Sequence, residues 1–119
     1  MNRERSYTFA RVMRIRGERE FDRVYKSGRR RAWKGFLVIA LANECGHPRL
    51  GISVPRRFGG SVPRNRIKRR IREAFRLSQH ELAAMDMLCV PQPGFEASVD
   101  ELRKMLVASA AELAGDLDN

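Results

Sequence analysis

Residues 61–76 hold the densest group of side chains that could bind a charged partner. Seven of these sixteen residues are Arg or Lys, and Glu73 is the one acid among them. A guanidinium group suits phosphate because it presents several N–H donors in a rigid, planar fork. An ordinary solvated helix face mixes both signs of charge at a spacing of three or four residues, and this segment barely does. The composition therefore predicts a surface that holds a polyanion.

The same segment also has the pattern of a helix with one buried side. Its apolar residues recur at the i, i+4, i+7, i+8 spacing of a helix packed on a core: Ile67, Ile71, Ala74 and Phe75. At about 100° per residue, a second set falls within roughly a 60° arc on the opposite side: Asn65, Arg69, Arg72 and Arg76. Ser61 as N-cap and Pro63 in the first turn predict a helix over about 62–83. Such a helix would be anchored by one face and would offer guanidinium groups on the other.

Covalent chemistry by the protein's own side chains is not predicted. Acids are scattered, no Gly-Lys-Ser or Gly-Lys-Thr phosphate loop occurs, and the two histidines have no partners at a useful spacing. Cys45 and Cys89 are too few for a disulfide framework, and with the histidines they do not form a recognised metal-binding pattern. Cys89 lies in an apolar run, which favours a buried free thiol. The sequence therefore indicates a protein that binds a partner, with no catalytic residue and no metal site of its own.

Composition indicates a nucleic acid as the partner. The 119 residues suffice for one domain, and a net charge of +10 with a pI near 10.9 is typical of nucleic-acid-binding proteins. Basic residues are concentrated in 1–34 and 49–76, whereas 77–119 contains two basic residues and eight acids. The charge is thus polarised, with one side for the partner. No apolar run is long enough to span a bilayer and no secretory signal is present, so we expect a cytoplasmic protein without membrane contact.

The expected fold is a single α+β domain, a mostly antiparallel sheet flanked by helices, in the order α-β-β-β-α-β-α. Helices are expected in three places: about 18–27, 62–83, and from a capping box of Ser98 and Glu101 to near Gly115. β-structure is expected in three segments: 30–42, with residues 36–41 as its apolar centre, 49–54 and 87–90. The first two segments should form an antiparallel pair. We expect a flexible basic lead-in at 1–13, the domain at 14–115 and a short acidic tail at 116–119.

Aromatic residues alternate with basic ones in the first third of the chain. Phe21 and Tyr25 lie among arginines and a lysine, and Trp33 follows three arginines and Ala32. Stacking of an unpaired base on such a ring is worth about 1–3 kcal/mol. At this spacing, however, packing between a helix and a sheet is the commoner role for Phe21 and Tyr25.

Taken together, these segments resemble one known family. Residues 64–76, Arg-Asn-Arg-Ile-Lys-Arg-Arg-Ile-Arg-Glu-Ala-Phe-Arg, are similar to the arginine-rich helix of the bacterial ribonuclease P protein subunit. Residues 49–57, Arg-Leu-Gly-Ile-Ser-Val-Pro-Arg-Arg, resemble the strand and basic loop that precede this helix in the family. The similarity covers about residues 12–114 and includes further single positions: Phe21, Val24, Tyr25, Gly28 and Asp86.

The resemblance implies a fold and a function. The fold would include a left-handed β-α-β crossover through the arginine-rich helix. Proteins of the family bind the catalytic RNA of ribonuclease P and the 5′ leader of precursor tRNA, and the RNA removes the leader using Mg²⁺. The protein would supply no catalytic group, bind no cofactor by itself and require no further protein partner.

The resemblance also implies roles for particular residues. Contacts to the catalytic RNA are expected from the basic helix: Arg64, Asn65, Arg66, Lys68, Arg69 and Arg72. The leader is expected in a cleft lined by aromatic and polar residues: Phe21, Tyr25, Phe36, Arg56 and Gln92. At Gln92 the family usually has a basic residue, and glutamine can hydrogen-bond a leader base or phosphate without adding charge.

Other functions stay open on the sequence alone. A structural RNA-binding protein, such as a small ribosomal protein, would use the same basic helix on a static RNA. It would differ by lacking a cleft with outward aromatic and polar side chains. A transcription factor would place residues 62–83 in a DNA major groove, but neither a short partner helix nor a dimer face is evident. A stand-alone nuclease is disfavoured because catalytic carboxylates and histidines are missing.

Overall fold

The computed structural model describes the backbone of residues 9–117 and the side chains as far as residue 115. These residues form three helices: α1 (Gly17–Ser27), α2 (Ser61–Ser78) and α3 (Val99–Leu117). They also form four strands: β1 (Arg29–Trp33), β2 (Phe36–Ala42), β3 (Arg49–Ile52) and β4 (Met85–Pro91). Three short 3₁₀ turns complete the described part of the chain: η1 (Arg11–Met13), η2 (Arg56–Phe58) and η3 (Gln79–Glu81). The order of helices and strands is the predicted one.

The four strands form one sheet in the order β1-β2-β4-β3. β1 pairs antiparallel with β2, and β2 pairs antiparallel with β4, so the sheet is mostly antiparallel as predicted. The predicted pairing of 30–42 with 49–54 is wrong, because β4 lies between β2 and β3 and pairs with both. β3 and β4 are parallel, and α2 supplies the crossover connection that parallel neighbours need. The left hand of this crossover stays a prediction from the resemblance.

The predicted β segment 30–42 is a hairpin of two strands, β1 and β2. β1 and β2 are joined by a two-residue turn in which Gly35 has φ +78°, a conformation that glycine adopts without steric cost. The hairpin pairs Trp33 with Phe36 next to the turn and Arg29 with Ala40 at its far end. The basic residues of β1 therefore lie along an edge of the sheet.

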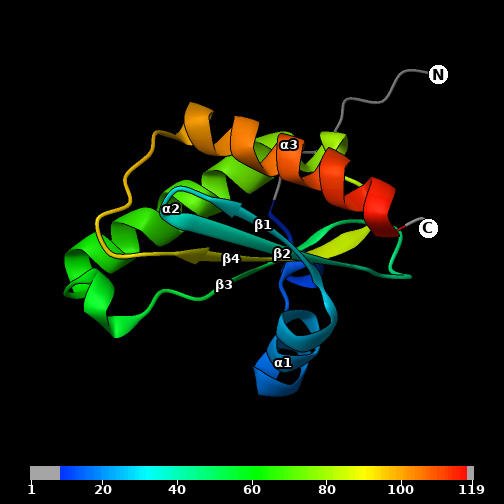
Figure 1. The fold of residues 1–119 in the computed structure, drawn as a ribbon, viewed down its shortest axis with the longest axis horizontal. Helices are drawn as coiled ribbons and strands as arrows, with labels where there is room; N and C mark the ends of the chain where they lie inside the picture. The colour runs from blue at the N-terminus through cyan, green and yellow to red at the C-terminus, as the bar shows by residue number, and fades with distance from the viewer. Residues whose placement is uncertain (1–8, 118–119) are drawn as a thin grey trace.

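Helices cover both faces of the sheet. α1 lies on one face, and α2 and α3 lie on the other (Figure 1). Because side chains alternate along a strand, β2 directs Val38 and Ala40 toward α2 and α3, and it directs Ile39 toward α1. A strand covered on both faces needs apolar residues at nearly every position, which is the pattern of residues 36–42.

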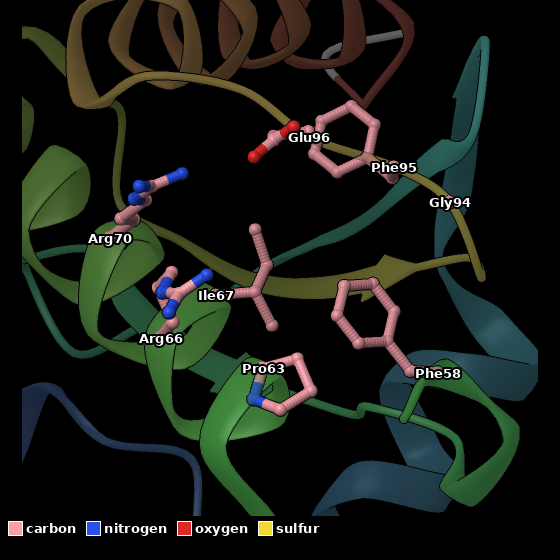
Figure 2. Close-up of a pocket in the computed structure, with 8 residues that line it drawn as sticks. All are labelled: Phe58, Pro63, Arg66, Ile67, Arg70, Gly94, Phe95 and Glu96. Carbon is pink, nitrogen blue, oxygen red and sulfur yellow. The ribbon is translucent and has the colours of Figure 1, made fainter. Parts of the chain in front are cut away.

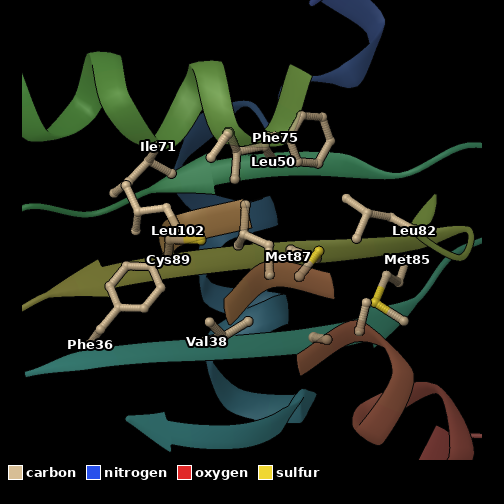
Figure 3. Close-up of a cluster of buried hydrophobic side chains, with 14 of the residues drawn as sticks. Phe36, Val38, Leu50, Ile71, Phe75, Leu82, Met85, Met87, Cys89 and Leu102 are labelled. Carbon is tan, nitrogen blue, oxygen red and sulfur yellow. The ribbon is translucent and has the colours of Figure 1, made fainter. Parts of the chain in front are cut away.

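The larger core lies between the sheet and the two helices α2 and α3 (Figure 3). Its central side chains come from β2, β3, β4 and both helices: Phe36, Val38, Leu50, Met87, Cys89, Ile71, Phe75 and Leu102. Burial of each large apolar side chain contributes about 1.5–3 kcal/mol. Cys89 is a buried free thiol as predicted, and burial raises its pKa to about 12, so the thiol stays protonated at physiological pH.

The observed helix ends agree only in part with the ends that the sequence predicts. Gly60 is the N-cap of α2, and Ser61 is its first residue rather than its cap. The α-helical part ends at Ser78 and continues as the 3₁₀ turn η3, so α2 is shorter than predicted. The capping box of α3 is confirmed: the Glu101 N–H donates to Ser98 Oγ at 3.1 Å, and the Ser98 N–H donates to Glu101 Oε1 at 2.8 Å. α3 continues past its predicted end to Leu117.

The structure differs from the predicted flexible lead-in at residues 9–13. The Phe9 ring contacts the buried Phe75 ring edge-on, with 5.5 Å between centroids. These residues therefore pack on the larger core. Residues 1–8 of the lead-in and residues 118–119 of the predicted acidic tail lie outside the described residues.

Candidate RNA-binding surfaces

α2 has the two faces that its sequence predicts. Ile67, Ile71, Ala74 and Phe75 are all buried, with at most 4% of the surface of each exposed, and they pack in the larger core. This burial fixes the rotation of the helix about its axis. The residues on the opposite side of the helix must then point away from the core.

The outward side of α2 carries a group of side chains that we call the cationic α2 surface: Asn65, Arg66, Lys68, Arg69 and Arg72. Lys68 is half-buried, and the other four residues are exposed. None of the five side chains has a hydrogen-bond or ion-pair partner among the described residues. Each guanidinium of this group therefore keeps its full set of donors for a phosphate.

The other basic residues of α2 are tied into the fold, among them Arg64 and Arg76. Arg64 was predicted to contact RNA, and its Nη2 donates to the Val54 carbonyl oxygen at 3.1 Å, which joins the start of the helix to the loop after β3. Arg76 pairs with Glu73, with 2.7 Å between Nη2 and Oε2. This hydrogen bond lowers the pKa of Glu73 and raises that of Arg76. Arg64 is thus partly engaged, and the charge of Arg76 is neutralised within the helix.

α1 places its two predicted aromatic residues in different surroundings. Phe21 is half-buried and rests on Gly51 of β3, where a Cβ atom would lie 2.9 Å from Phe21 Cζ. Tyr25 is 51% exposed, and the Arg30 guanidinium lies 4.6 Å from the centroid of its ring. Core packing therefore describes part of the role of Phe21 but not that of Tyr25, which keeps ring surface available for stacking.

Phe36 lies on the wrong side of the sheet for the predicted cleft. It is 1% exposed, belongs to the larger core and stacks on Phe95, with ring centroids 4.9 Å apart and planes at 11°. Because side chains alternate along β2, its neighbour Leu37 faces the same side as α1. The prediction that Phe36 lines a leader-binding cleft is therefore wrong.

α1 leaves part of its sheet face uncovered. The strand register brings Ala32, Leu37 and Val90 side by side on this face, with Ala32 exposed and the other two half-buried. Farther along the same strands, Ile39 and Leu88 are buried in the cluster beneath α1. We call Ala32, Leu37 and Val90 the open sheet face. None of the three was singled out by the sequence.

Polar residues lie at the end of the open sheet face. The Gln92 N–H donates to the Gly35 carbonyl oxygen at 2.9 Å, and its Oε1 accepts from Arg57 Nη2 at 3.3 Å. Arg56 and Arg57 are both exposed in η2. The guanidinium that contacts Gln92 is thus that of Arg57, a residue outside the predicted leader-binding set. It places a positive charge next to a position where this chain has a neutral side chain.

A small hollow joins α1 to α2 across β3. Its volume is about 160 Å³, and its lining includes Phe21 and Gly51 together with Lys68 and Arg72. Phe21 belongs to the predicted leader-binding set, and the two basic residues belong to the predicted set for the catalytic RNA. The fold therefore brings the two sets together at the edge of the sheet.

A buried ion cluster positions α1 on the sheet. Asp86 is fully buried and accepts hydrogen bonds from Arg49 (2.7 and 2.8 Å), from Asn43 Nδ2 (2.8 Å) and from Arg23 Nη2 (3.1 Å). Burial alone would raise the pKa of Asp86, but the hydrogen bonds from Arg49 and Asn43 outweigh it and hold the pKa below its ordinary value. Arg23 comes from α1 and Arg49 from β3, so the carboxylate links helix to sheet.

The described residues contain no cluster of three or more His, Cys, Asp or Glu side chains that could hold a metal ion. Cys45 is an exposed free thiol at the turn before β3. Within the same part of the chain, no helix is both long enough and apolar enough to cross a membrane.

Similarity to known proteins extends over nearly all of the chain. A family model described as Ribonuclease P matches residues 9–114. The ribonuclease P protein component of Desulfotalea psychrophila is 41% identical and covers 87% of this chain and 87% of its own length. That of Nitrosococcus oceani is 37% identical, with 76% of each chain covered. This chain belongs to the ribonuclease P protein family.

Solved structures of ribonuclease P proteins share the fold. The Staphylococcus aureus protein has a TM-score of 0.72 and 34% identity, covering 86% of this chain and 94% of that one. The Thermotoga maritima protein has a TM-score of 0.74 and 28% identity, covering 83% of this chain and 96% of that one. The α+β architecture described above is therefore that of the ribonuclease P proteins.

Family membership settles the class of function. The chain is the protein subunit of ribonuclease P, so it is part of an endoribonuclease that processes tRNA. It is an RNA-binding protein whose partner in the ribonucleoprotein is the ribonuclease P RNA. The matches support this subunit and not the alternative of a small ribosomal protein.

Proposed function

We propose that this subunit holds two RNA molecules on two surfaces. The ribonuclease P RNA binds the cationic α2 surface, and the 5′ leader of precursor tRNA binds along α1 and the open sheet face. The subunit thereby positions the leader for removal by the RNA, which yields the mature 5′ end of the tRNA.

The unpaired cations of α2 are the observation that carries the first half of the proposal. Arg66, Arg69 and Arg72 project from one side of a helix whose opposite side is buried. Their guanidinium groups would contact RNA phosphates, and each contact would release counterions and make the affinity depend on salt. Lys68 and Asn65 add donors on the same side, and Arg64 can add a contact through the donors that Val54 does not use.

Exposed ring and apolar surface support the second half of the proposal. A single-stranded leader offers unstacked bases, which proteins bind by stacking on aromatic rings and by polar contacts to the base edges. Tyr25 offers such a ring, and Leu37 and Val90 offer apolar surface beside Phe21. Arg56, Arg57 and Gln92 would meet the leader's phosphates and base edges at the end of this face.

The proposal assigns the chemistry of cleavage to the RNA. In the assembled enzyme the RNA uses Mg²⁺ to cut the leader, and the protein contributes binding and position. It requires no further protein partner, and it acts in the cytoplasm, where precursor tRNA is processed.

Cleavage of precursor tRNA by a bacterial ribonuclease P RNA at low Mg²⁺ tests the proposal directly. Adding this chain should restore cleavage at the correct 5′ site, because the two proposed surfaces would hold the leader beside the RNA. If the chain binds the RNA but never aids cleavage, α2 is a general RNA anchor and the proposed leader contact is wrong.

A further inference from the structure

A second hollow lies beside the first turns of α2 (Figure 2). Its volume is about 220 Å³, and we call it the α2 hollow. Its walls come from three parts of the chain: α2, the 3₁₀ turn η2, and the loop between β4 and α3. In Figure 2 the rings of Phe58 and Phe95 stand on one side, and the guanidinium groups of Arg66 and Arg70 stand on the other.

The aromatic wall of the α2 hollow is held in place from behind. Phe95 stacks on the buried Phe36 at 4.9 Å, and its ring also lies against Gly35, where a Cβ atom would come within 3.3 Å. Phe58 and Phe95 are both half-buried and pack against the larger core, and the floor is formed by the buried Ile67. The hollow therefore presents fixed, flat apolar surface that is partly open to solvent.

Two opposite charges face the α2 hollow without pairing. Arg66 and Glu96 are both exposed, and neither side chain has a hydrogen-bond or ion-pair partner among the described residues. Arg70 is tethered, because its Nη1 donates to the Ala97 carbonyl oxygen at 3.3 Å. One free cation and one free carboxylate are thus left to interact with whatever enters.

A carboxylate in this position requires an explanation. It stands beside the cationic α2 surface, where it would repel an RNA phosphate and reduce affinity for RNA. It favours binding when it accepts hydrogen bonds from the RNA, since an ionised carboxylate has acceptors and no donor, and a base edge can supply two donors at once. Guanine offers two parallel donors on one edge, N1–H and the N2 amino group. Adenine offers an acceptor, N1, at the corresponding place.

We propose that the α2 hollow receives one unpaired guanine base of an RNA bound on α2. Glu96 accepts from the guanine N1–H and N2–H, the rings of Phe58 and Phe95 contact the base, and Arg66 holds a neighbouring phosphate. The volume lies below the roughly 300–1,000 Å³ of pockets for drug-sized ligands, so it limits the occupant to a small group such as one base. The inference rests on the proposed function, because the RNA that supplies the base is the one that α2 holds.

Short uridine RNAs with one central guanosine or adenosine provide the test. We expect the full chain to bind the guanosine RNA about fivefold or more tightly than the adenosine RNA, the low end for a bidentate contact to a base. Glu96→Gln should remove this preference, because an amide presents a donor in place of one acceptor. Glu44→Gln changes the same charge on an exposed residue outside the hollow and should keep it.

Amide NMR signals show where the base binds. The guanosine RNA should shift the signals of Gly94, Phe95 and Glu96, and the adenosine RNA should shift them less. The inference is overturned if the wild-type chain shows no preference, if Glu96→Gln keeps it, or if these three signals do not respond. Arg69→Ala with Arg72→Ala separates the two proposals, because neither residue lines the hollow. If that pair leaves affinity for ribonuclease P RNA unchanged, the proposed function fails instead.

Discussion

Asp86 is the buried carboxylate that links α1 to the sheet, and Glu20 of α1 adds a longer ion pair to Arg49, with 3.5 Å between Oε1 and Nη1. Arg49, the main partner of Asp86, is only 14% exposed, whereas Arg23 is 52% exposed and contributes less because solvent screens it. We expect Asp86→Asn to lower the free energy of unfolding by about 3 kcal/mol, because the largely buried Arg49 guanidinium would lose its main counter-charge and keep only the longer ion pair with the partly exposed Glu20. Urea unfolding at neutral pH measures this. Asp22→Asn, on the exposed side of α1, should change stability by no more than about 0.5 kcal/mol.

The same carboxylate predicts how stability depends on pH. Its pKa is lowered in the folded state, so its contribution is fully present above the unfolded value of about 3.9 and is lost as the pH falls through the lower folded value. We therefore expect the wild-type chain to lose more stability than Asp86→Asn on acidification below about pH 4. Urea unfolding of both chains at a series of acidic pH values measures the difference. Parallel losses would show that Asp86 does not supply this dependence.

Tyr25 distinguishes binding of the leader from packing in the core. Its ring is half exposed, and on one side it carries the Arg30 guanidinium. We expect Tyr25→Ala to weaken binding of precursor tRNA to the assembled enzyme by about fivefold or more, as loss of one stacked base requires. Binding of mature tRNA, which lacks the leader, should not change, and Tyr25→Phe should retain most of the affinity. Equal losses of affinity for precursor and mature tRNA would mean that Tyr25 has only a structural role.

At the scale of the element, α2 should determine how binding to ribonuclease P RNA depends on salt. Arg69 and Arg72 are exposed and unpaired among the described residues, so each can neutralise one phosphate. Replacing both by alanine should weaken binding and reduce the slope of log affinity against log salt by about 2. Lys104→Glu on α3 removes the same net charge and should leave the slope nearly unchanged. A slope that responds equally to both variants would mean that net charge alone drives binding.

The sequence predicts correctly which side of α2 is buried, although it places the end of the helix too late. Ile67, Ile71 and Phe75 recur at helical spacing because one face of the helix is buried and the other is not. The pattern therefore predicts both that the segment is a helix and which face packs on the core. The capping box of α3 is equally local, because Ser98 and Glu101 are three residues apart. Local patterns of this kind can be found without knowing the rest of the fold.

The sheet could not be predicted in the same way. β2 is covered on both faces, so its residues are apolar without alternation, and nothing in the run tells which of Phe36 and Leu37 faces α1. The predicted pairing of β2 with β3 was wrong for a related reason. β4 lies between them, and a strand that comes more than thirty residues after β3 leaves no mark on the local pattern. The error at Phe36 follows directly, because a shift of one residue moves a side chain to the other face.

The residues of the α2 hollow were missed because they are distant in sequence. Phe58, Arg66 and Glu96 come from three separate segments that meet only in the folded chain. The nearest signal in the sequence was a lone acid at 96 in a loop with no basic residue beside it. The contact of Arg57 with Gln92 was missed for the same reason, although both lie in segments that the resemblance had marked.

At the scale of the whole molecule, charge is divided between two sides. The cationic α2 surface belongs to a stretch rich in arginine, whereas the outward residues of α3 include Asp100, Glu101 and Glu112. α2 and α3 cover the same face of the sheet (Figure 1). The exposed charged residues of α2 are basic, whereas those described on α3 are three acids and Lys104. A polyanion should therefore approach the chain in one orientation, with α3 turned away.

Site-specific photocrosslinking tests this orientation. In a Cys45→Ser background, which removes the exposed thiol, one cysteine can carry a short photoreactive group at Asn65→Cys on α2 or at Ala108→Cys on α3; both positions are exposed. We expect crosslinks to ribonuclease P RNA from position 65 and none above background from position 108. High salt should abolish the crosslinks from position 65, because phosphate contacts weaken steeply with salt. Comparable crosslinks from both positions would mean that the RNA also covers α3, and that the division of charge does not orient the complex.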